Sequence, residues 1–179
     1  CLIAWWGFNS WIPAYLSLPP AQGGRGLDAR AMAWLVVLMQ VGMWFGYVTF
    51  GAVADAFGRK RTYVTYLLMA ALLLGLYAQV SSPLVLLLLG PFVAFFGTGY
   101  FTGFGIVTAE SYPTAIRATA QGLTYNIGRL ASAAAPFVVG SLADQRGFAT
   151  AFTVTSAAFV LAALWWFVIP ETRGRSVRA

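Results

Sequence analysis

Long apolar runs separated by short polar segments make up most of the chain. Runs of this kind predict helices that cross a membrane, because a bilayer core of about 30 Å needs about 20 apolar residues in a helix. We therefore predict an all-α membrane protein with six transmembrane helices, at residues 1–17, 31–54, 62–80, 84–109, 119–143 and 148–169. The first run would give only about 24 Å of helix, so we interpret the chain as beginning inside a span.

Polar and turn-forming residues mark the boundaries between these runs. Residues 18–30 carry Pro-Pro and Gly-Gly pairs with mixed charge, which predict a loop. The charge-free stretch from Thr62 to Ala109 is too long for one crossing, so we place a turn at residues 81–83, Ser-Ser-Pro. Residues 109–119 and 141–147 bring charge back and are predicted to connect the later spans.

The composition indicates that the surface of the protein faces lipid rather than water. Hydrophobic residues make up 60% of the chain and charged residues 9%, with a mean hydropathy of +0.75. A soluble domain carries about 25% charged residues. The net charge of +6 is therefore interpreted as bases gathered at one membrane face, and no nucleic-acid partner is expected. With one cysteine, Cys1, and no histidine, we expect no metal site and no cofactor.

The distribution of lysine and arginine predicts the orientation. Alternate connectors lie on opposite sides of the membrane, and the side with more bases is usually cytoplasmic. One side would hold Arg59, Lys60, Arg61, Arg117, Arg173, Arg175 and Arg178, and the other Arg25, Arg30 and Arg146. We therefore expect both ends of the chain to be cytoplasmic.

Arg129 lies inside the fifth predicted span, about 15 Å from its start. An arginine at this depth is costly unless it faces a bundle interior or a water-filled cavity. Tyr125 and Asn126 share its helix face, and Gln40 and Asn9 are polar residues at similar depth in other spans. We predict that these five residues bind solute, with the guanidinium holding a carboxylate. The alternative is a structural arginine bonded to backbone carbonyls or to an acid elsewhere.

Four tryptophans in the predicted spans are further candidates for lining a cavity. They are Trp5, Trp6, Trp11 and Trp44. Tryptophan also belongs at membrane interfaces and in helix–helix packing, and that alternative stays open for each of them.

Three motifs carry a resemblance to a known family. Residues 51–61, GAVADAFGRKR, place Gly51, Asp55, Gly58 and Arg59 in a G-x-x-x-D-x-x-G-R connector with a turn at Gly58. Residues 110–117 read E-x-x-P-x-x-x-R, and residues 170–174 read PETRG. Together these resemble the signature connectors of the Major Facilitator Superfamily of transporters.

The resemblance implies that residues 1–179 are a C-terminal six-helix bundle, spans seven to twelve of twelve. The partner would be an N-terminal six-helix half of the same polypeptide. It also implies a secondary active transporter that works by alternating access. A charge cluster would close its cytoplasmic end, formed by Asp55, Arg59, Glu110, Arg117, Glu171 and Arg173 together with Gly51 and Gly58.

The class of solute is predicted from resemblances to particular groups of transporters within this family. PETRG resembles sugar porters, yet the paired-glutamine and G-P-x-x-W motifs of those porters are absent. Residues 109–129 look closer to bacterial metabolite:proton symporters for carboxylates. We therefore expect an organic-anion symporter, coupled to protons, in a bacterial inner membrane. A sugar or polyol porter, and a channel or non-transporting receptor-like protein, are the alternatives. An intramembrane protease is disfavoured because the chain lacks histidine and a pair of membrane acids.

Overall fold

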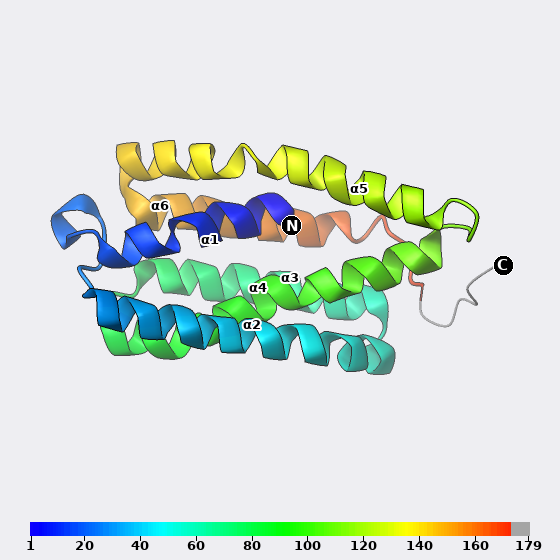
Figure 1. Ribbon diagram of the computed structural model, residues 1–179, viewed down its shortest axis with the longest axis horizontal. Coiled ribbons are helices and arrows are strands. Elements are labelled where there is room, and N and C mark those ends of the chain that lie inside the picture. Colours follow the sequence, from blue (N-terminus) through cyan, green and yellow to red (C-terminus); the bar gives the residue numbers. More distant parts are fainter. Residues whose placement is uncertain (173–179) are drawn as a thin grey trace.

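Helices account for nearly all of residues 1–172, the part of the chain that the computed structural model describes. The elements are α1 (Leu2–Ser17), the short 3-10 helix η1 (Pro20–Gln22), α2 (Ala29–Phe57), α3 (Arg59–Gln79), α4 (Pro83–Ser111), α5 (Arg117–Ser132) and α6 (Ala135–Trp165). The helices run nearly parallel or antiparallel along one long axis (Figure 1). The all-α prediction is confirmed.

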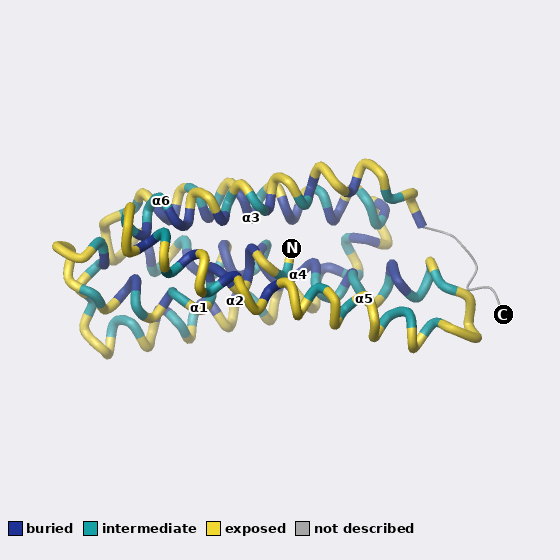
Figure 2. The backbone as a smooth tube through the Cα atoms, turned by 90° about the horizontal axis from the view of Figure 1, so that it is seen from above, coloured by how far each residue is buried: buried dark blue, intermediate teal, exposed yellow. Residues whose placement is uncertain are grey.

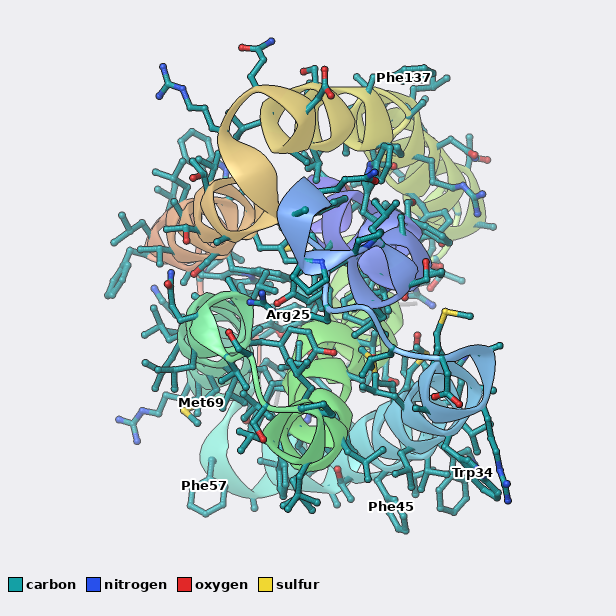
Figure 3. All side chains as sticks on the ribbon, turned by 90° about the vertical axis from the view of Figure 1, so that its left-hand side faces the viewer. Arg25, Trp34, Phe45, Phe57, Met69 and Phe137 are labelled. Atoms are coloured by element: carbon teal, nitrogen blue, oxygen red, sulfur yellow. The ribbon has the colours of Figure 1, made fainter. Side chains whose placement is uncertain are left out.

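The bundle has two packed groups of helices. Helices α2, α3 and α4 form one group, while α1, α5 and α6 form the other (Figures 1 and 3). Contacts between α3 and α6 join the two groups. The first part of α6 continues the line of α5, and the chain then reverses at Gly147, where φ is 81° and ψ is 159°. Helix α1 contacts both α5 and α6.

Small residues set the close approach of α2 to α4. A Cβ added at Gly42 would overlap the carbonyl oxygen of Pro91, and one added at Gly46 would overlap that of Phe95. Apolar burial does not drive helix association in lipid, so such small-residue faces gain their stability from close van der Waals contact. The G-x-x-x-G spacing at residues 42–46 thus places backbone against backbone.

Aromatic side chains fill the interior. Phe8, Tyr15, Tyr77 and Phe152 are all fully buried, and Phe8 and Tyr15 each meet Phe152 edge-on at a centroid distance of 5.0 Å. Exposed positions follow the outer faces of the helices (Figure 2). Many carry large apolar side chains, and Trp34, Phe45, Phe57 and Phe137 point away from the bundle (Figure 3). An apolar exterior of this kind fits an integral membrane protein.

The number of membrane crossings is only partly tested. Four helical segments within residues 1–172 are long and apolar enough to cross a membrane: Ala29–Phe57, Arg59–Gln79, Pro83–Ser111 and Arg117–Trp165. Helix α1 has 16 residues, which is short for a crossing. The last of the four segments contains the break between α5 and α6 and the reversal at Gly147. Six crossings therefore stay a prediction.

The predicted connectors are longer than the observed ones. Between α2 and α3 only Gly58 is non-helical, so Arg59, Lys60 and Arg61 form the first turn of α3 rather than a loop. Helix α4 continues to Ser111, and residues 141–146 are helical up to Gly147. Conversely, α6 ends at Trp165 rather than at residue 169. Charge marks the edge of the apolar region, but lysine, arginine and glutamate are good helix formers and do not end a helix.

Candidate functional site

Gly58 forms the turn between α2 and α3. Its φ of 99° and ψ of 149° lie in a region that favours glycine, and its N–H donates to the carbonyl oxygen of Ala54 at 3.0 Å. Because one residue makes the whole turn, the last turn of α2 and the first turn of α3 lie side by side. The guanidinium of Arg59 consequently donates to the carboxylate of Asp55.

Arg59 also binds an acid on a different helix. Its Nη2 and Nε donate to Oε1 of Glu110, near the end of α4, at 3.1 Å and 3.3 Å. The side chains of Arg59 and Glu110 are only 13% and 12% exposed, whereas that of Asp55 is 70% exposed. An ion pair shielded from water is stronger than an exposed one. The contact to Glu110 is therefore the stronger of the two.

Glu171 binds the start of α3 from the far end of the described chain. Its carboxylate accepts the backbone N–H groups of Arg59 at 3.0 Å and of Lys60 at 3.1 Å. The first N–H groups of a helix have no partner inside it, and the helix dipole favours an anion there. Glu171 thus acts as a cap for α3 and fixes the segment after α6 against it.

Thr172 completes this group of side chains. Its Oγ1 donates to Oε2 of Glu110 at 2.5 Å, and its N–H donates to Oε1 of Glu171 at 3.0 Å. We call Asp55, Arg59, Glu110, Glu171 and Thr172 the Arg59 cluster. It joins α2, α3, α4 and the segment after α6 at the right-hand end of the bundle in Figure 1.

Two other residues predicted for this cluster, Arg117 and Gly51, do not join it. Arg117 binds its own connector, donating from Nε to the carbonyl oxygen of Tyr112 at 3.3 Å and from Nη2 to Oγ1 of Thr114 at 3.1 Å. A hydrogen-bonded turn closes residues 113–116 and brings these acceptors within reach. Gly51 lies on α2 with open space where a side chain would be. Arg173 lies outside the described residues.

Arg129 lies near the end of α5, beside α1. Its guanidinium carbon is 5.8 Å from the ring centre of Tyr125, one turn earlier, and this ring in turn meets Phe104 of α4 at 5.7 Å. Arg129 is exposed. It belongs to neither of the two ion pairs that form among residues 1–172. The positive charge is therefore not neutralised by an acid within the described bundle.

A small cavity opens beside Arg129. It has a volume of about 210 Å³ and is lined by Trp6, Arg129, Ser132, Ala133 and Pro136. The break between α5 and α6 shapes one wall, and α1 supplies the indole of Trp6. Ser132 donates its hydroxyl to the carbonyl oxygen of Arg129 at 2.8 Å. The cavity thus combines one cation with an aromatic ring and apolar walls.

The other residues predicted to bind solute do not line this cavity. Asn126 is exposed and donates its side-chain amide to the carbonyl oxygen of Gly122 at 2.8 Å. Gln40 is exposed on α2, and Asn9 is half-buried on α1. Similar depth in the sequence did not place them together, because depth along a span says nothing about the direction in which a side chain points.

Thr172 was not predicted from the sequence as part of these sites, whereas Trp6 was one of the candidates for lining a cavity. Thr172 belongs to the PETRG motif, so its position next to Glu171 was the available signal. Trp6 was one of four tryptophans named together, and only the packing of the helices shows which of the four lies beside Arg129. Trp5 is buried, Trp11 donates its indole N–H to Pro136, and Trp44 is exposed on α2.

A larger cavity, of about 670 Å³, lies at the opposite end of the bundle from the Arg59 cluster. Trp11, Gln22, Asp144 and Phe148 are among its lining residues. It occurs where η1 meets the reversal at Gly147, so loop geometry accounts for the opening. We assign the solute no contact there.

Comparison with known proteins identifies relatives over the whole chain. The model of the Major Facilitator Superfamily matches residues 1–179. A putative metabolite transport protein of Haemophilus influenzae is 36% identical over 174 residues, which cover 97% of this chain and 42% of that protein. A cis,cis-muconate transport protein of Acinetobacter baylyi is 35% identical over 158 residues, covering 88% and 37%. The chain thus spans about two fifths of the length of these curated relatives.

A solved structure supports the fold alone. The crystal structure of a peptide transporter POT mutant in complex with alafosfalin matches with a TM-score of 0.78, over 98% of this chain and 38% of that one. The two sequences are 18% identical. The helical arrangement is therefore shared with a transporter of known structure.

Proposed function

Because the chain belongs to the Major Facilitator Superfamily, we propose that the full-length protein is a secondary active transporter for a small carboxylate. Residues 1–179 form its C-terminal six-helix half, and an N-terminal half of the same polypeptide completes it. The relatives that match the chain are named as transport proteins, which favours transport over catalysis.

We infer the class of solute from the surroundings of Arg129. Its guanidinium borders a cavity, and none of the acids in the described bundle pairs with it. A carboxylate matches the fork of N–H donors on a guanidinium and would neutralise its charge. The muconate transport protein, which is 35% identical, is named for a carboxylate solute. Arg129 is therefore assigned to bind the carboxylate of the solute.

The Arg59 cluster supplies a device for alternating access. Its contacts join three helices and the segment after α6 at one end of the bundle. Such pairs are weak in water and stronger where packing excludes water, so closure of that end strengthens them and opening weakens them. A contact that differs between two states biases their equilibrium. We assign this end to the cytoplasmic gate, in a bacterial inner membrane.

Proton coupling requires a titratable group that this bundle lacks at its centre. The chain has five acids. Asp28, Asp55 and Glu110 lie at or near helix ends, Asp144 lies just before the reversal at Gly147 in α6, and Glu171 follows α6. We propose that the N-terminal half supplies the carboxylate that carries the proton. The solute site would then be shared between the two halves.

Uptake into proteoliposomes tests this function. The full-length protein is reconstituted, and the entry of radiolabelled carboxylates is followed with and without an inward proton gradient. The proposal expects saturable uptake that the gradient accelerates. Flux that does not saturate would indicate a channel, and uptake of sugars but not of carboxylates would indicate a sugar porter; either result would overturn the proposal.

A further inference from the structure

We propose that Gln121 is a positioning residue for Arg129. By bonding α5 to α4, Gln121 fixes the rotation of α5 about its own axis, and this rotation directs the guanidinium of Arg129 to the cavity. The inference rests on the proposed function, because Arg129 must bind the carboxylate. It adds a residue, remote from the carboxylate, that sets the direction of the guanidinium.

Apolar packing holds little of α5. Among residues 117–132, which form this helix in the described structure, only Ser132 is buried. Large apolar side chains on the helix are exposed instead, among them Leu123 at 62%, Ile127 at 59% and Leu130 at 77%. A helix with so few buried side chains needs other contacts to fix its rotation. Between helices in lipid, hydrogen bonds supply contacts of this kind.

Gln121 bonds α5 to α4. Its side-chain amide donates to the carbonyl oxygen of Gly105 at 3.1 Å and to Oγ1 of Thr108 at 2.8 Å. Thr108 is only 8% exposed, and its own hydroxyl donates to the carbonyl oxygen of Phe104 at 2.6 Å. One side chain of α5 therefore meets two acceptors on α4, and one of the two is buried.

Two further contacts lie on the same face of α5. The hydroxyl oxygens of Thr124 and Tyr112 are 3.3 Å apart, and the ring of Tyr125 meets that of Phe104 at a centroid distance of 5.7 Å. Positions 121, 124 and 125 share a helix face, because residues three and four apart are neighbours on a helix. The hydroxyl pair is exposed, and a ring contact has little directionality. Gln121 therefore contributes most to the rotation of α5.

The direction of Arg129 depends on this rotation. Gln121 precedes Arg129 by eight residues, about 12 Å along the helix axis, so it does not reach a carboxylate bound by the guanidinium. Side-chain ends lie about 5–6 Å from a helix axis, and a rotation of about 20° would move them by about 2 Å. The N···O distance of a hydrogen bond varies by only about 0.5 Å. A small rotation of α5 would thus separate the guanidinium from its ligand.

The other surroundings of Arg129 leave its direction free. It belongs to neither of the two ion pairs formed among residues 1–172. Its guanidinium carbon is 5.8 Å from the ring centre of Tyr125, and a cation over a ring tolerates a range of positions. Next to it, a Cβ added at Gly128 would meet Cδ1 of Leu2 on α1, the end of a flexible side chain. The hydrogen bonds to α4 are therefore the contacts that set the rotation.

Titration calorimetry on the purified full-length protein tests this role, with benzoate, succinate and gluconate as probes. Gln121→Met keeps the length of the side chain and removes both hydrogen bonds. We expect it to raise the Kd of each acid that the unmodified protein binds by about 3- to 20-fold, the range that an interhelical hydrogen bond in a membrane allows. The number of binding sites per protein should stay the same, because the site is turned rather than unfolded. Fewer sites at an unchanged Kd would show a role in folding alone and overturn the inference.

Two threonines of α4 supply a matched pair of variants. Thr108→Val removes the buried acceptor of Gln121 and should also raise the Kd. Thr102→Val removes a different interhelical hydrogen bond, from Oγ1 to the carbonyl oxygen of Tyr47 on α2 at 3.2 Å, and should leave the Kd unchanged. Equal effects of the two variants would contradict a specific role for the contact between α4 and α5.

A double variant separates this inference from the function on which it rests. In Arg129→Gln, the addition of Gln121→Met should cause no further rise in Kd, because the guanidinium that Gln121 directs is gone. A full additional rise would overturn the positioning role and leave the carboxylate site intact. An unchanged Kd in Arg129→Gln alone, or no binding of any of the three acids to the unmodified protein, would overturn the carboxylate site and the positioning role with it.

Discussion

At the scale of single residues, burial ranks the contacts of the Arg59 cluster. Asp55 and Glu110 both bind the same guanidinium, yet their side chains are 70% and 12% exposed. An exposed ion pair contributes about 0.2–1 kcal/mol, whereas loss of one partner from a shielded pair costs about 3–5 kcal/mol. Glu110 is only partly shielded, so its loss should cost less than that upper range.

Neutralising the two acids separately tests this ranking. We expect Glu110→Gln to lower the free energy of unfolding of the full-length protein in mixed micelles by about 1–3 kcal/mol. Asp55→Asn is expected to lower it by less than about 1 kcal/mol. Equal losses, or a larger loss for Asp55→Asn, would show that burial does not control the strength of these contacts.

Which residues could be predicted depends on how each contact arises. Asp55, Arg59, Glu110 and Glu171 were named from motifs, and they do lie together. Their role as a gate stays a proposal. The motif also named Arg117, but a turn in the connector brought closer acceptors to its guanidinium. The proximity of Trp6 to Arg129 depends on how α1 packs against α5, and no local pattern records this packing.

At the scale of elements, glycine positions decide how closely helices approach. Gly46 meets the backbone of Phe95 on α4, while Gly51, on the same helix, has nothing within 4 Å of an added Cβ. Helix α2 therefore offers a close-packed glycine and an open one. The apolar pattern predicted an all-helical chain, but it misplaced helix ends where charged residues continue a helix, as Arg59–Arg61 do at the start of α3. It also missed the break between α5 and α6, which falls inside the predicted span 119–143.

The two glycines of α2 form a matched pair of substitutions. Gly46→Val should separate α2 from α4 and lower the melting temperature of the full-length protein in detergent by several degrees, because overpacking costs about 1–3 kcal/mol. Gly51→Ala should leave the melting temperature unchanged or raise it slightly, because alanine favours the helix. A tolerated Gly46→Val would contradict the close packing of α2 on α4.

At the scale of the whole molecule, the two ends of the bundle carry different charged groups. The Arg59 cluster lies at one end, and the loop at residues 18–28 lies at the other (Figure 1). The excess of bases predicts that the first end is the cytoplasmic one. Six crossings would place both chain ends on that side. Four helical segments in the described part of the chain meet the length and hydropathy of a crossing, so the full count needs a direct test.

Cysteine labelling tests this topology. In full-length protein with Cys1 replaced by serine, a membrane-impermeant maleimide added to intact cells should label Gln22→Cys and leave Ala115→Cys unlabelled. Both positions are exposed, and they lie in connectors at opposite ends of the bundle. In inside-out vesicles the pattern should reverse. Labelling of both positions from the same side would contradict the proposed arrangement.

The central claim is that Arg129 holds the carboxylate of the solute, and binding affinity tests it most directly. We expect the Kd of the full-length protein for its carboxylate to rise by about 10- to 100-fold in Arg129→Gln, because a charge-assisted hydrogen bond contributes about 1.5–3 kcal/mol. Arg117→Gln is the control, since Arg117 binds its own connector at the far end of α5. A Kd that is unchanged in a folded Arg129→Gln protein would contradict the account.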